Sequence, residues 1–346
     1  MKILVTGAAG FIGSKIASLL AARGDEVTGI DSINDYYDVR LKWGRLSELG
    51  IGDGRSDIEW GKTYSSVTYP TLRFQRMALE DKEAIDKLFD EEQFDRVVNL
   101  AAQAGVRYSI TNPYAYLTSN LTGFLNILEA CRNHPVQHLL FASSSSVYGM
   151  NTKAPFSEDD KVDAPVSLYA ATKKANELMA HSYSKLYGIP ATGLRYFTVY
   201  GPWGRPDMAP MLFARAISKG EPIKVFNYGD MIRDFTYIDD IAFGSIQCLD
   251  QPPVAEQCAN HVPFRVYNIG CSHPVKLIDF ISEIESALGL KAEKVMLPMQ
   301  PGDVYMTNAD TTKLETEIGY KPRVTLHEGI IRFIEWYKSE KNPLAD

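Results

Sequence analysis

The fold is decided by the stretch KILVTGAAGFIG, residues 2–13, near the start of the chain. Residues 2–6 are predicted to form a strand, and the turn at residues 7–13 leads directly into a helix that ends near residue 24. A second strand, residues 26–30, ends in Asp31. A strand, a glycine turn, a helix and a strand, with an acid about 20 residues on, form the dinucleotide-binding arrangement. The sequence therefore predicts an α/β protein with a Rossmann-type doubly wound parallel sheet.

The turn and the acid also predict which dinucleotide is bound. Glycines let the backbone approach a pyrophosphate at the helix N-terminus, where free N–H groups and the helix dipole favour an anion. Asp31 would accept hydrogen bonds from the ribose hydroxyls of the adenosine and would repel a 2′-phosphate. We therefore expect NAD as the cofactor in preference to NADP.

A second stretch, residues 139–173, carries the candidate chemistry. The apolar run LLFA, residues 139–142, predicts a buried strand, and four serines follow it. A helix is predicted over residues 167–187, where Tyr169 and Lys173 share one face, one turn apart. A phenol has a pKa of about 10 and is a poor base at neutral pH, but a nearby cation lowers that pKa. Such a pair also occurs in ordinary amphipathic helices, and it is the glycine turn that favours a catalytic role.

Composition narrows the class of protein. The chain has 346 residues, of which 45% are hydrophobic and 23% charged, so it is long enough for two domains and typical of globular proteins. The net charge of −7 argues against a nucleic-acid partner. No apolar run approaches the ~18 residues that a membrane span needs. The histidines and cysteines show no metal-ligand spacing, so we expect no metal site and reduced thiols in a cytoplasmic protein.

The glycine turn and the Tyr169/Lys173 pair together resemble the extended short-chain dehydrogenase/reductase family. Within it, the chain is most similar to the NAD-dependent nucleotide-sugar epimerases, and closest to the UDP-glucuronate 4-epimerases. Three features depart from the family: Ala78 where an Asp or Asn near the adenine is usual, Asn99 in place of a common His, and a long connection at residues 50–72. The other matching segments are NDYYD (34–38), LAAQAGVRYS (100–109), NLTGFLN (120–126), RYFTVYGP (195–202), GRPDM (204–208) and RDFTYIDD (233–240).

The resemblance implies an enzyme that interconverts UDP-glucuronate and UDP-galacturonate through a 4-keto intermediate and transient NADH. Ser144 and Tyr169 would act on the C4 hydroxyl of the sugar, with the Tyr169 phenolate stabilised by Lys173 and by the nicotinamide charge. The implied catalytic residues are Ser144, Tyr169 and Lys173. The implied cofactor-binding residues are Gly7, Gly10, Phe11, Ile12, Gly13, Asp31, Asn34, Leu100, Ala101, Ala102, Gln103, Tyr169, Lys173 and Tyr196.

The resemblance also implies how the substrate is held. Ser145, Ser146, Thr198 and Arg205 would surround the sugar carboxylate, although a serine run after a strand can also simply cap a turn. Related decarboxylases and UDP-glucose/galactose 4-epimerases carry Asn at the position of Thr198, and both activities remain alternatives. The implied contacts to UDP are Val225 and Phe226 at the uracil, Arg233 at the diphosphate and Asp303 at the ribose. For Arg233, an ion pair with a neighbouring Asp is the alternative.

The chain is expected to form two domains. Residues 1–200 would bind NAD, and residues 201–346 would form a smaller α/β domain that binds the UDP-sugar, with some segments returning to the first domain. Helices predicted at 113–133 and 167–187 form a dimer interface in the family, so a homodimer is implied. Residues 50–72 contain several apolar and aromatic side chains, too many for a solvated tether. We hypothesise that this segment covers the adenosine, and the alternative is a surface excursion on the outside of the sheet.

Overall fold

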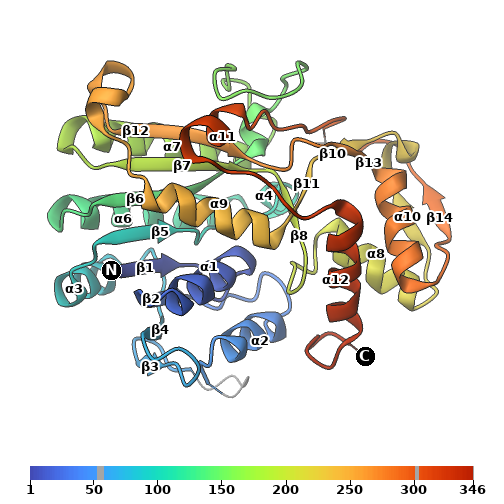
Figure 1. The fold of residues 1–346 in the computed structure, drawn as a ribbon, viewed down its shortest axis with the longest axis horizontal. Coiled ribbons are helices and arrows are strands. Elements are labelled where there is room, and N and C mark those ends of the chain that lie inside the picture. Colours follow the sequence, from blue (N-terminus) through green and yellow to red (C-terminus); the bar gives the residue numbers. More distant parts are fainter. Residues whose placement is uncertain (53–57, 301–303, 346) are drawn as a thin grey trace.

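The computed structural model describes residues 1–52, 58–300 and 304–345, and an eight-stranded sheet lies at its centre (Figure 1). The strand order is β12-β7-β6-β5-β1-β2-β4-β3, and every pair is parallel except β3 with β4. The chain leaves β1 toward β2 and β4 and then crosses to β5. The topological switch of this doubly wound sheet therefore lies between β1 and β5, which is where such sheets bind ligands. The strands are β1 (Lys2–Thr6), β2 (Glu26–Asp31), β3 (Thr63–Ser65), β4 (Leu72–Arg76), β5 (Arg96–Asn99), β6 (His138–Ser144), β7 (Ala191–Tyr196) and β12 (Phe264–Ile269).

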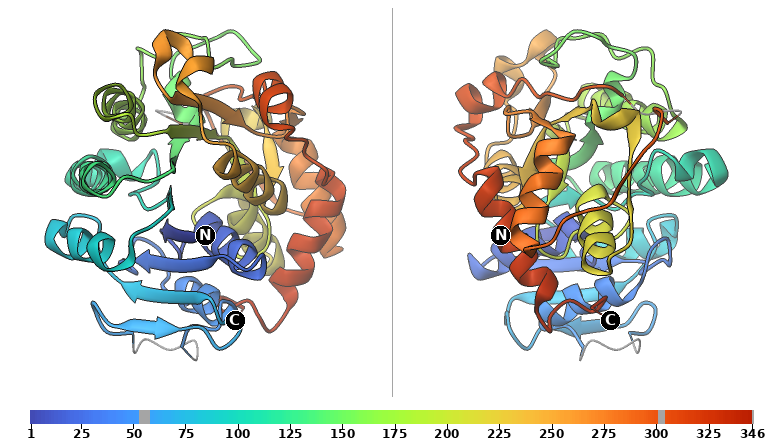
Figure 2. Two further views of the ribbon diagram at one scale, coloured as in Figure 1. Left: turned by 60° about the vertical axis from the view of Figure 1, so that its left-hand side comes forward. Right: turned by 90° about the vertical axis from the view of Figure 1, so that its right-hand side faces the viewer.

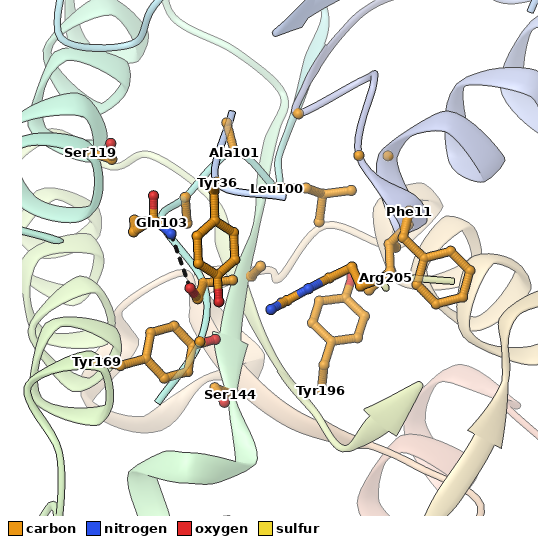
Figure 3. Close-up of a pocket in the computed structure, with 18 of the residues that line it drawn as sticks. Phe11, Tyr36, Leu100, Ala101, Gln103, Ser119, Ser144, Tyr169, Tyr196 and Arg205 are labelled. Carbon is orange, nitrogen blue, oxygen red and sulfur yellow. Dashed lines mark hydrogen bonds between the residues drawn. The ribbon is translucent and has the colours of Figure 1, made fainter. Parts of the chain in front are cut away.

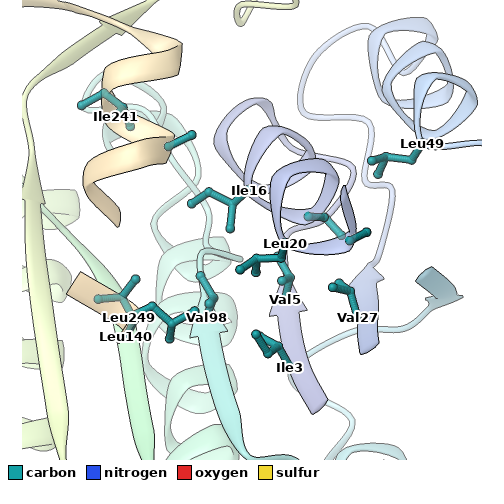
Figure 4. Close-up of a cluster of buried hydrophobic side chains, with 14 of the residues drawn as sticks. Ile3, Val5, Ile16, Leu20, Val27, Leu49, Val98, Leu140, Ile241 and Leu249 are labelled. Carbon is teal, nitrogen blue, oxygen red and sulfur yellow. The ribbon is translucent and has the colours of Figure 1, made fainter. Parts of the chain in front are cut away.

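Helices cover both faces of this sheet, which confirms the predicted fold class (Figure 2). On one face, Ile16 of α1 and Leu249 of α9 share a hydrophobic cluster with Leu140 of β6 (Figure 4). The neighbours Leu139 and Phe141 point to the other face, where α3, α6 and α7 pack. Because both faces are buried, the central strands are continuous apolar runs. The helices against the sheet are α1 (Phe11–Ala22), α2 (Arg40–Glu48), α3 (Lys82–Glu92), α6 (Gly123–Asn133), α7 (Leu168–Tyr187), α9 (Ile238–Asp250) and α11 (Thr312–Ile318).

A smaller lobe lies beside the sheet and has a hydrophobic core of its own. The rings of Phe235 and Phe280 stack there, with centroids 3.9 Å apart. Strand β12, although late in the chain, pairs with β7 of the large sheet, so the chain passes between the lobes more than once. The domain boundary predicted after residue 200 stays a prediction. The elements of the smaller lobe are β8 (Thr198–Tyr200), α8 (Ala209–Ser218), β9 (Ile223–Val225), β10 (Ile232–Arg233), β11 (Phe235–Tyr237), β13 (Val275–Lys276), α10 (Leu277–Leu288), β14 (Lys294–Met296) and α12 (Leu326–Lys338).

The helix predicted over residues 113–133 is divided into three parts. A π-helical segment, η1 (Leu117–Thr122), separates α5 (Pro113–Tyr116) from α6. π-helical turns of this kind are frequent at functional sites, and Ser119 of η1 lines the cavity described below. The remaining short helices are α4 (Tyr108–Thr111), η2 (Ser145–Tyr148), η3 (Phe226–Gly229), η4 (Ala255–Gln257) and η5 (Ala259–His261).

Residues 50–72 lie at the outer edge of the sheet, so the hypothesis that they cover the adenosine is wrong for the residues described. Strand β3 pairs antiparallel with β4. Ile58 is buried beside the sheet, and Tyr64 and Tyr69 pack against the same core. None of the described residues of this segment lines the cavity of the candidate site. Ile58, Tyr64 and Tyr69 therefore extend the core at the edge of the sheet.

Candidate active site

A cavity of about 380 Å³ opens at the carboxyl ends of β1, β5 and β6, beside loops of the smaller lobe (Figure 3). All three catalytic candidates line it, together with Ser145, Ser146, Thr198 and Arg205. The structure therefore brings segments far apart in the sequence to one place. The predicted cofactor-binding residues that line it are Gly7, Gly10, Phe11, Ile12, Gly13, Asp31, Asn34, Leu100, Ala101, Ala102, Gln103, Tyr169, Lys173 and Tyr196, which is the complete predicted set.

The glycine turn is so tight at Gly7 and Gly13 that neither position has room for a side chain. Gly7 has a φ of +71°, and a Cβ there would lie 2.9 Å from the backbone nitrogen of Ala101. At Gly13, a Cβ would lie 2.0 Å from the carbonyl oxygen of Gly7. Among the described residues, no side chain caps the N-terminus of α1. Its free N–H groups are therefore available to an anionic group at this end of the cavity.

Asp31 stands at the end of β2 with its carboxylate held by the backbone. Its Oδ2 accepts the N–H of Ala9 at 3.2 Å, and its Oδ1 accepts the N–H of Ile33 at 2.7 Å. The ammonium of Lys42 lies 4.0 Å from Asp31 Oδ1 and donates to Asn34 Oδ1 at 2.8 Å. A fixed carboxylate suits the hydroxyls of a ribose, and the uncapped helix end suits a pyrophosphate. The residues present therefore fit NAD.

Helix α7 presents Tyr169 and Lys173 to the cavity, one turn apart. The helix begins where the hydroxyl of Ser167 accepts the N–H of Ala170 at 3.1 Å, which places Tyr169 in the first turn. Lys173 is buried, and its Nζ donates to the carbonyl oxygen of Ala142 on β6 at 2.8 Å. Burial lowers the pKa of Lys173 to about 8, because a charged amine is disfavoured away from water.

The phenol of Tyr169 lies where several groups act on its ionisation. Withdrawal from water raises the pKa of Tyr169, whereas the Ser144 hydroxyl and the positive charge of Arg205 act to lower it. The sequence led us to expect Lys173 and the nicotinamide as the charges that favour the phenolate. The structure adds Arg205, a residue predicted only as a substrate contact, and its charge reaches the phenol from the opposite lobe.

The π-helical segment η1 fixes part of the cavity wall. The side chain of Asn120 accepts the N–H of Gln103 at 2.7 Å and donates to the Gln103 carbonyl at 3.1 Å. The same amide donates to the Thr172 hydroxyl at 3.0 Å, and the carbonyl of Asn120 accepts from Asn176 of α7 at 2.7 Å. Asn120 thus joins the strand end after β5 to the helix that carries Tyr169.

The residues predicted to bind a sugar carboxylate all line the cavity. Ser145 and Ser146 begin η2, directly after Ser144, whose hydroxyl donates to Ser146 Oγ at 3.1 Å. Thr198 begins β8, and Arg205 lies in the loop that follows. The cavity is therefore lined by hydroxyl donors and a guanidinium, a set of donors suited to an anionic group.

Three of the predicted UDP contacts lie outside the cavity, and the fourth falls outside the described residues. Val225 is fully buried in the core of the smaller lobe, and Phe226 is packed against that core. Arg233 donates to backbone carbonyls, including that of Val304 at 2.6 Å. Asp303 belongs to the residues that the structure does not describe.

Sequence reasoning missed several residues that line the cavity, among them Tyr36, Lys42, Met77 and Glu80. Tyr36 follows β2, and Met77 and Glu80 follow β4. Since the carboxyl ends of parallel strands share one edge, their position after a predicted strand could have indicated them. Ala78, where the family carries an acid or amide, is not among the lining residues although its neighbours are.

Two features are absent from the described residues, 1–52, 58–300 and 304–345. No group of three or more His, Cys, Asp or Glu side chains is placed to hold a metal ion within these ranges. No helix among the residues described is both long enough and apolar enough to span a membrane.

Comparison with known proteins agrees with this arrangement. Residues 3–270 match the NAD dependent epimerase/dehydratase family. An uncharacterized 37.6 kDa protein of Escherichia coli O111:H- is 54% identical, over 98% of this chain and 98% of its own. A probable UDP-glucuronate 4-epimerase of Rhizobium meliloti (strain 1021) is 45% identical, over 97% of this chain and 97% of its own.

The fold is also similar to that of solved structures. The crystal structure of the UDP-glucuronic acid 4-epimerase of Bacillus cereus, in complex with UDP-glucuronic acid and NAD, matches with a TM-score of 0.84. The two sequences are 35% identical, and the match covers 98% of this chain and 99% of that one. The similarity therefore extends over both lobes and the cavity beside them.

Proposed function

This chain belongs to the NAD dependent epimerase/dehydratase family, and on that premise we propose that it is a UDP-glucuronate 4-epimerase. The enzyme uses NAD and interconverts UDP-glucuronate and UDP-galacturonate. The observation that carries the proposal is the cavity itself, which joins Tyr169, Lys173 and Ser144 to a set of anion-binding side chains at the sugar end. A relative and a solved structure that are both named as UDP-glucuronate 4-epimerases support this activity.

The residues of the cavity divide the chemistry between them. Bound NAD supplies the nicotinamide that takes up hydride from C4 of the sugar and later returns it. Tyr169, as the phenolate, accepts the proton of the C4 hydroxyl and gives it back to the same oxygen at the end of the cycle. The Ser144 hydroxyl lies beside the phenol and orients the C4 oxygen. Lys173, whose Nζ is held by the Ala142 carbonyl, keeps its amine in the cavity one helix turn from Tyr169.

The carboxylate end of the cavity has a protective role. A 4-keto hexuronate is a β-keto acid, and it loses carbon dioxide when its carboxylate stands perpendicular to the plane of the ketone. The hydroxyls of Ser145, Ser146 and Thr198, with Arg205, can hold the carboxylate in another orientation. Small neutral donors fix that geometry without protonating the intermediate. This clamp distinguishes the proposed epimerase from a decarboxylase.

The test is to incubate the purified protein with UDP-glucuronate and to separate the product sugars. We expect UDP-galacturonate and a negligible amount of pentose. A pentose with one equivalent of carbon dioxide would instead identify a UDP-glucuronate decarboxylase. Conversion of UDP-glucose to UDP-galactose, with no reaction of UDP-glucuronate, would identify the other alternative.

The nucleotide half of the substrate is proposed to extend toward the smaller lobe. We assign Phe226 to the uracil, Arg233 to the diphosphate and Asp303 to the ribose, and we no longer assign Val225 to the uracil, because its side chain is fully buried. In support, Val106 lines the cavity, and the guanidinium of its neighbour Arg107 lies 5.4 Å from the centre of the Phe226 ring. A substrate leaving the cavity at this point would thus reach Phe226. Replacing Phe226 with Ala should raise the KM for both UDP-sugars equally, since the sugar ends are held elsewhere.

We also propose a homodimer formed through helices α6 and α7. Leu125 of α6 is 39% exposed, and Leu178 and Leu186 of α7 are 57% and 69% exposed. Apolar side chains gathered on two neighbouring helices are typical of an interface between copies. Sedimentation should give twice the chain mass, and Leu178→Glu should give a monomer. Sedimentation of the unaltered protein as a monomer at micromolar concentration would contradict the proposal.

A cytoplasmic location is proposed for the enzyme. Its four cysteines are free thiols in the structure, and Cys131 and Cys248 are fully buried. Burial raises the pKa of both thiols, so they stay protonated. Unpaired cysteines are typical of a reducing compartment, and fractionation of the native host would check the location.

A further inference from the structure

Arg205 enters the cavity with one edge of its guanidinium already bound. Its Nε donates to Asp207 Oδ1 at 3.0 Å, and its Nη2 donates to Asp207 Oδ2 at 2.6 Å. The hydroxyl of Tyr36 donates to the same Oδ2 at 3.1 Å. Figure 3 shows the guanidinium reaching between Tyr36 and Tyr196 toward the Tyr169 hydroxyl. Within the described ranges Nη1 makes no hydrogen bond, so it is the nitrogen available to a substrate.

We propose that Asp207 is a positioning residue that aims Arg205 at the end of the sugar that carries both C4 and the carboxylate, and that it offsets part of the positive charge there. Asp207 does not line the cavity, and its side chain is 33% exposed, so it acts through Arg205. Tyr36, from the loop after β2, holds the carboxylate from the other lobe. The inference rests on the proposed epimerase function and adds a residue that limits the side reaction.

The chemistry of the intermediate explains why the charge must be limited. When a 4-keto hexuronate loses carbon dioxide, the C5–C6 bond breaks and its electron pair remains as an enolate shared between C5 and the C4 oxygen. A proton then adds at C5 to give the pentose. A full positive charge beside the C4 oxygen would stabilise the enolate and would accelerate this loss. Asp207 weakens that charge, while Arg205 Nη1 remains free to hold the sugar.

The positive charge of Arg205 also acts to lower the pKa of Tyr169, so a change in that charge can be measured there. An anion removed from the neighbourhood of a phenol favours the phenolate, so the pKa of the phenol falls. The other groups near Tyr169 are Ser144 at the end of β6, Lys173 one turn along α7, Tyr36 after β2 and Tyr116 of α5. Burial raises the pKa of Tyr36 to about 12 and raises that of Tyr116 further, so both stay neutral. Lys173, with a pKa of about 8, affects the alkaline limb of a pH profile. The ionisation of Tyr169 is therefore followed on the acid limb.

The experiment compares the NAD-loaded protein with its Asp207→Asn variant. We expect the acid limb of the kcat profile to move to lower pH by about half a unit, a modest shift because Asp207 is partly exposed. The share of turnovers that end in pentose and carbon dioxide should rise at the same time. Asp207→Glu keeps the charge and should retain the unaltered profile. A shifted product ratio without any movement of the acid limb would overturn the charge argument.

A matched control is available outside the cavity. Asp38 forms the same kind of pair with a residue two positions away, and Arg40 Nη2 donates to its Oδ2 at 2.8 Å. Asp38→Asn should leave both the pH profile and the product ratio unchanged. An equal shift in this variant would show a general charge effect and would refute the specific role of Asp207.

A measurement without substrate separates this inference from the proposed function. The near-ultraviolet absorbance of tyrosinate can be titrated in each protein and compared with the same protein carrying Tyr169→Phe. The difference reports the ionisation of Tyr169 alone, and it should begin at lower pH in Asp207→Asn. If the unaltered protein does not convert UDP-glucuronate, the epimerase proposal fails, but this titration still decides whether Asp207 acts on Tyr169.

Discussion

The cavity has two walls that are held in different ways. In the wall of the glycine turn and α7, side chains are fixed by nearby backbone: Asp31 by two N–H groups and Lys173 by a strand carbonyl. In the wall at the sugar end, side chain holds side chain across the lobes, as where Tyr36 meets Asp207, which in turn holds Arg205. The difference teaches that cofactor geometry depends on the rigid sheet, whereas substrate geometry depends on how the two lobes fit together.

The two walls are joined at Arg45 of α2. Its side chain is buried, and it donates to the Ala9 carbonyl of the glycine turn at 3.1 Å and to the Trp203 carbonyl of the other lobe at 2.7 Å. It also donates to the Tyr37 hydroxyl at 2.6 Å. The indole of Trp203 lies so close to Gly44 that a Cβ there would be 2.5 Å away. This contact therefore fixes the sugar-end loop relative to the cofactor turn.

The largest effect is expected at the wall that carries the chemistry. Tyr169→Phe removes the base while leaving the ring in place, and turnover should fall by at least about a hundredfold. NAD content and the affinity for UDP-sugars should be unchanged, because neither depends on the hydroxyl. Steady-state rates and equilibrium binding check both statements. More than about a tenth of the normal rate would mean that another group is the base.

A stability effect is expected at the glycine turn. Gly13→Ala places a Cβ against the Gly7 carbonyl, and overpacking of this kind costs about 1–3 kcal/mol. The free energy of unfolding in urea should fall by that amount, and the purified protein should retain less NAD. Ser18→Ala on the same helix serves as the control and should change neither. Full NAD retention by Gly13→Ala would show that the turn can relax.

A smaller loss is expected at the junction between the walls. Arg45→Met keeps the length of the side chain but leaves the carbonyl acceptors of Ala9 and Trp203 without their donor, at a cost of about 1–2 kcal/mol. The KM for UDP-glucuronate should rise more than the NAD content falls. The reason is that Trp203 lies in the same loop as Arg205, a proposed substrate contact. Arg40→Met, on the exposed part of the same helix, should have little effect on either quantity. Equal changes in the two variants would remove Arg45 from this role.

The smallest change in rate is expected at the residues proposed to hold the sugar carboxylate. The products formed should change there instead. Thr198→Ala and Ser145→Ala each remove one hydroxyl from the sugar end of the cavity. The carboxylate gains freedom to turn, so a larger share of turnovers should end in loss of carbon dioxide. Quantifying pentose against hexuronate products tests the prediction. An unchanged, negligible pentose yield in both variants would rule out the clamp.

Sequence reasoning located the cofactor wall more completely than the substrate wall. The residues of the glycine turn, Asp31 and the Tyr169/Lys173 pair lie in short local motifs, where spacing along a strand or helix determines which side chains meet. Val225 and Phe226 did not reach the cavity, and Tyr36 was missed, because their positions depend on loops and on the second lobe. The covering role expected of residues 50–72 failed for a related reason. Their apolar side chains indicated burial but could not show against which surface.

The sequence by itself determined the parallel sheet, the glycine turn and the helix that carries Tyr169 and Lys173. Local backbone geometry and hydrophobic periodicity act over a few residues, and both can be read directly from a single chain. Only the tertiary structure decided that the charge of Arg205 reaches Tyr169, that Tyr36 holds Asp207, and that Arg45 joins the lobes. Contacts between segments far apart in the sequence follow from how completed elements pack against one another. No pattern within either segment determines that packing.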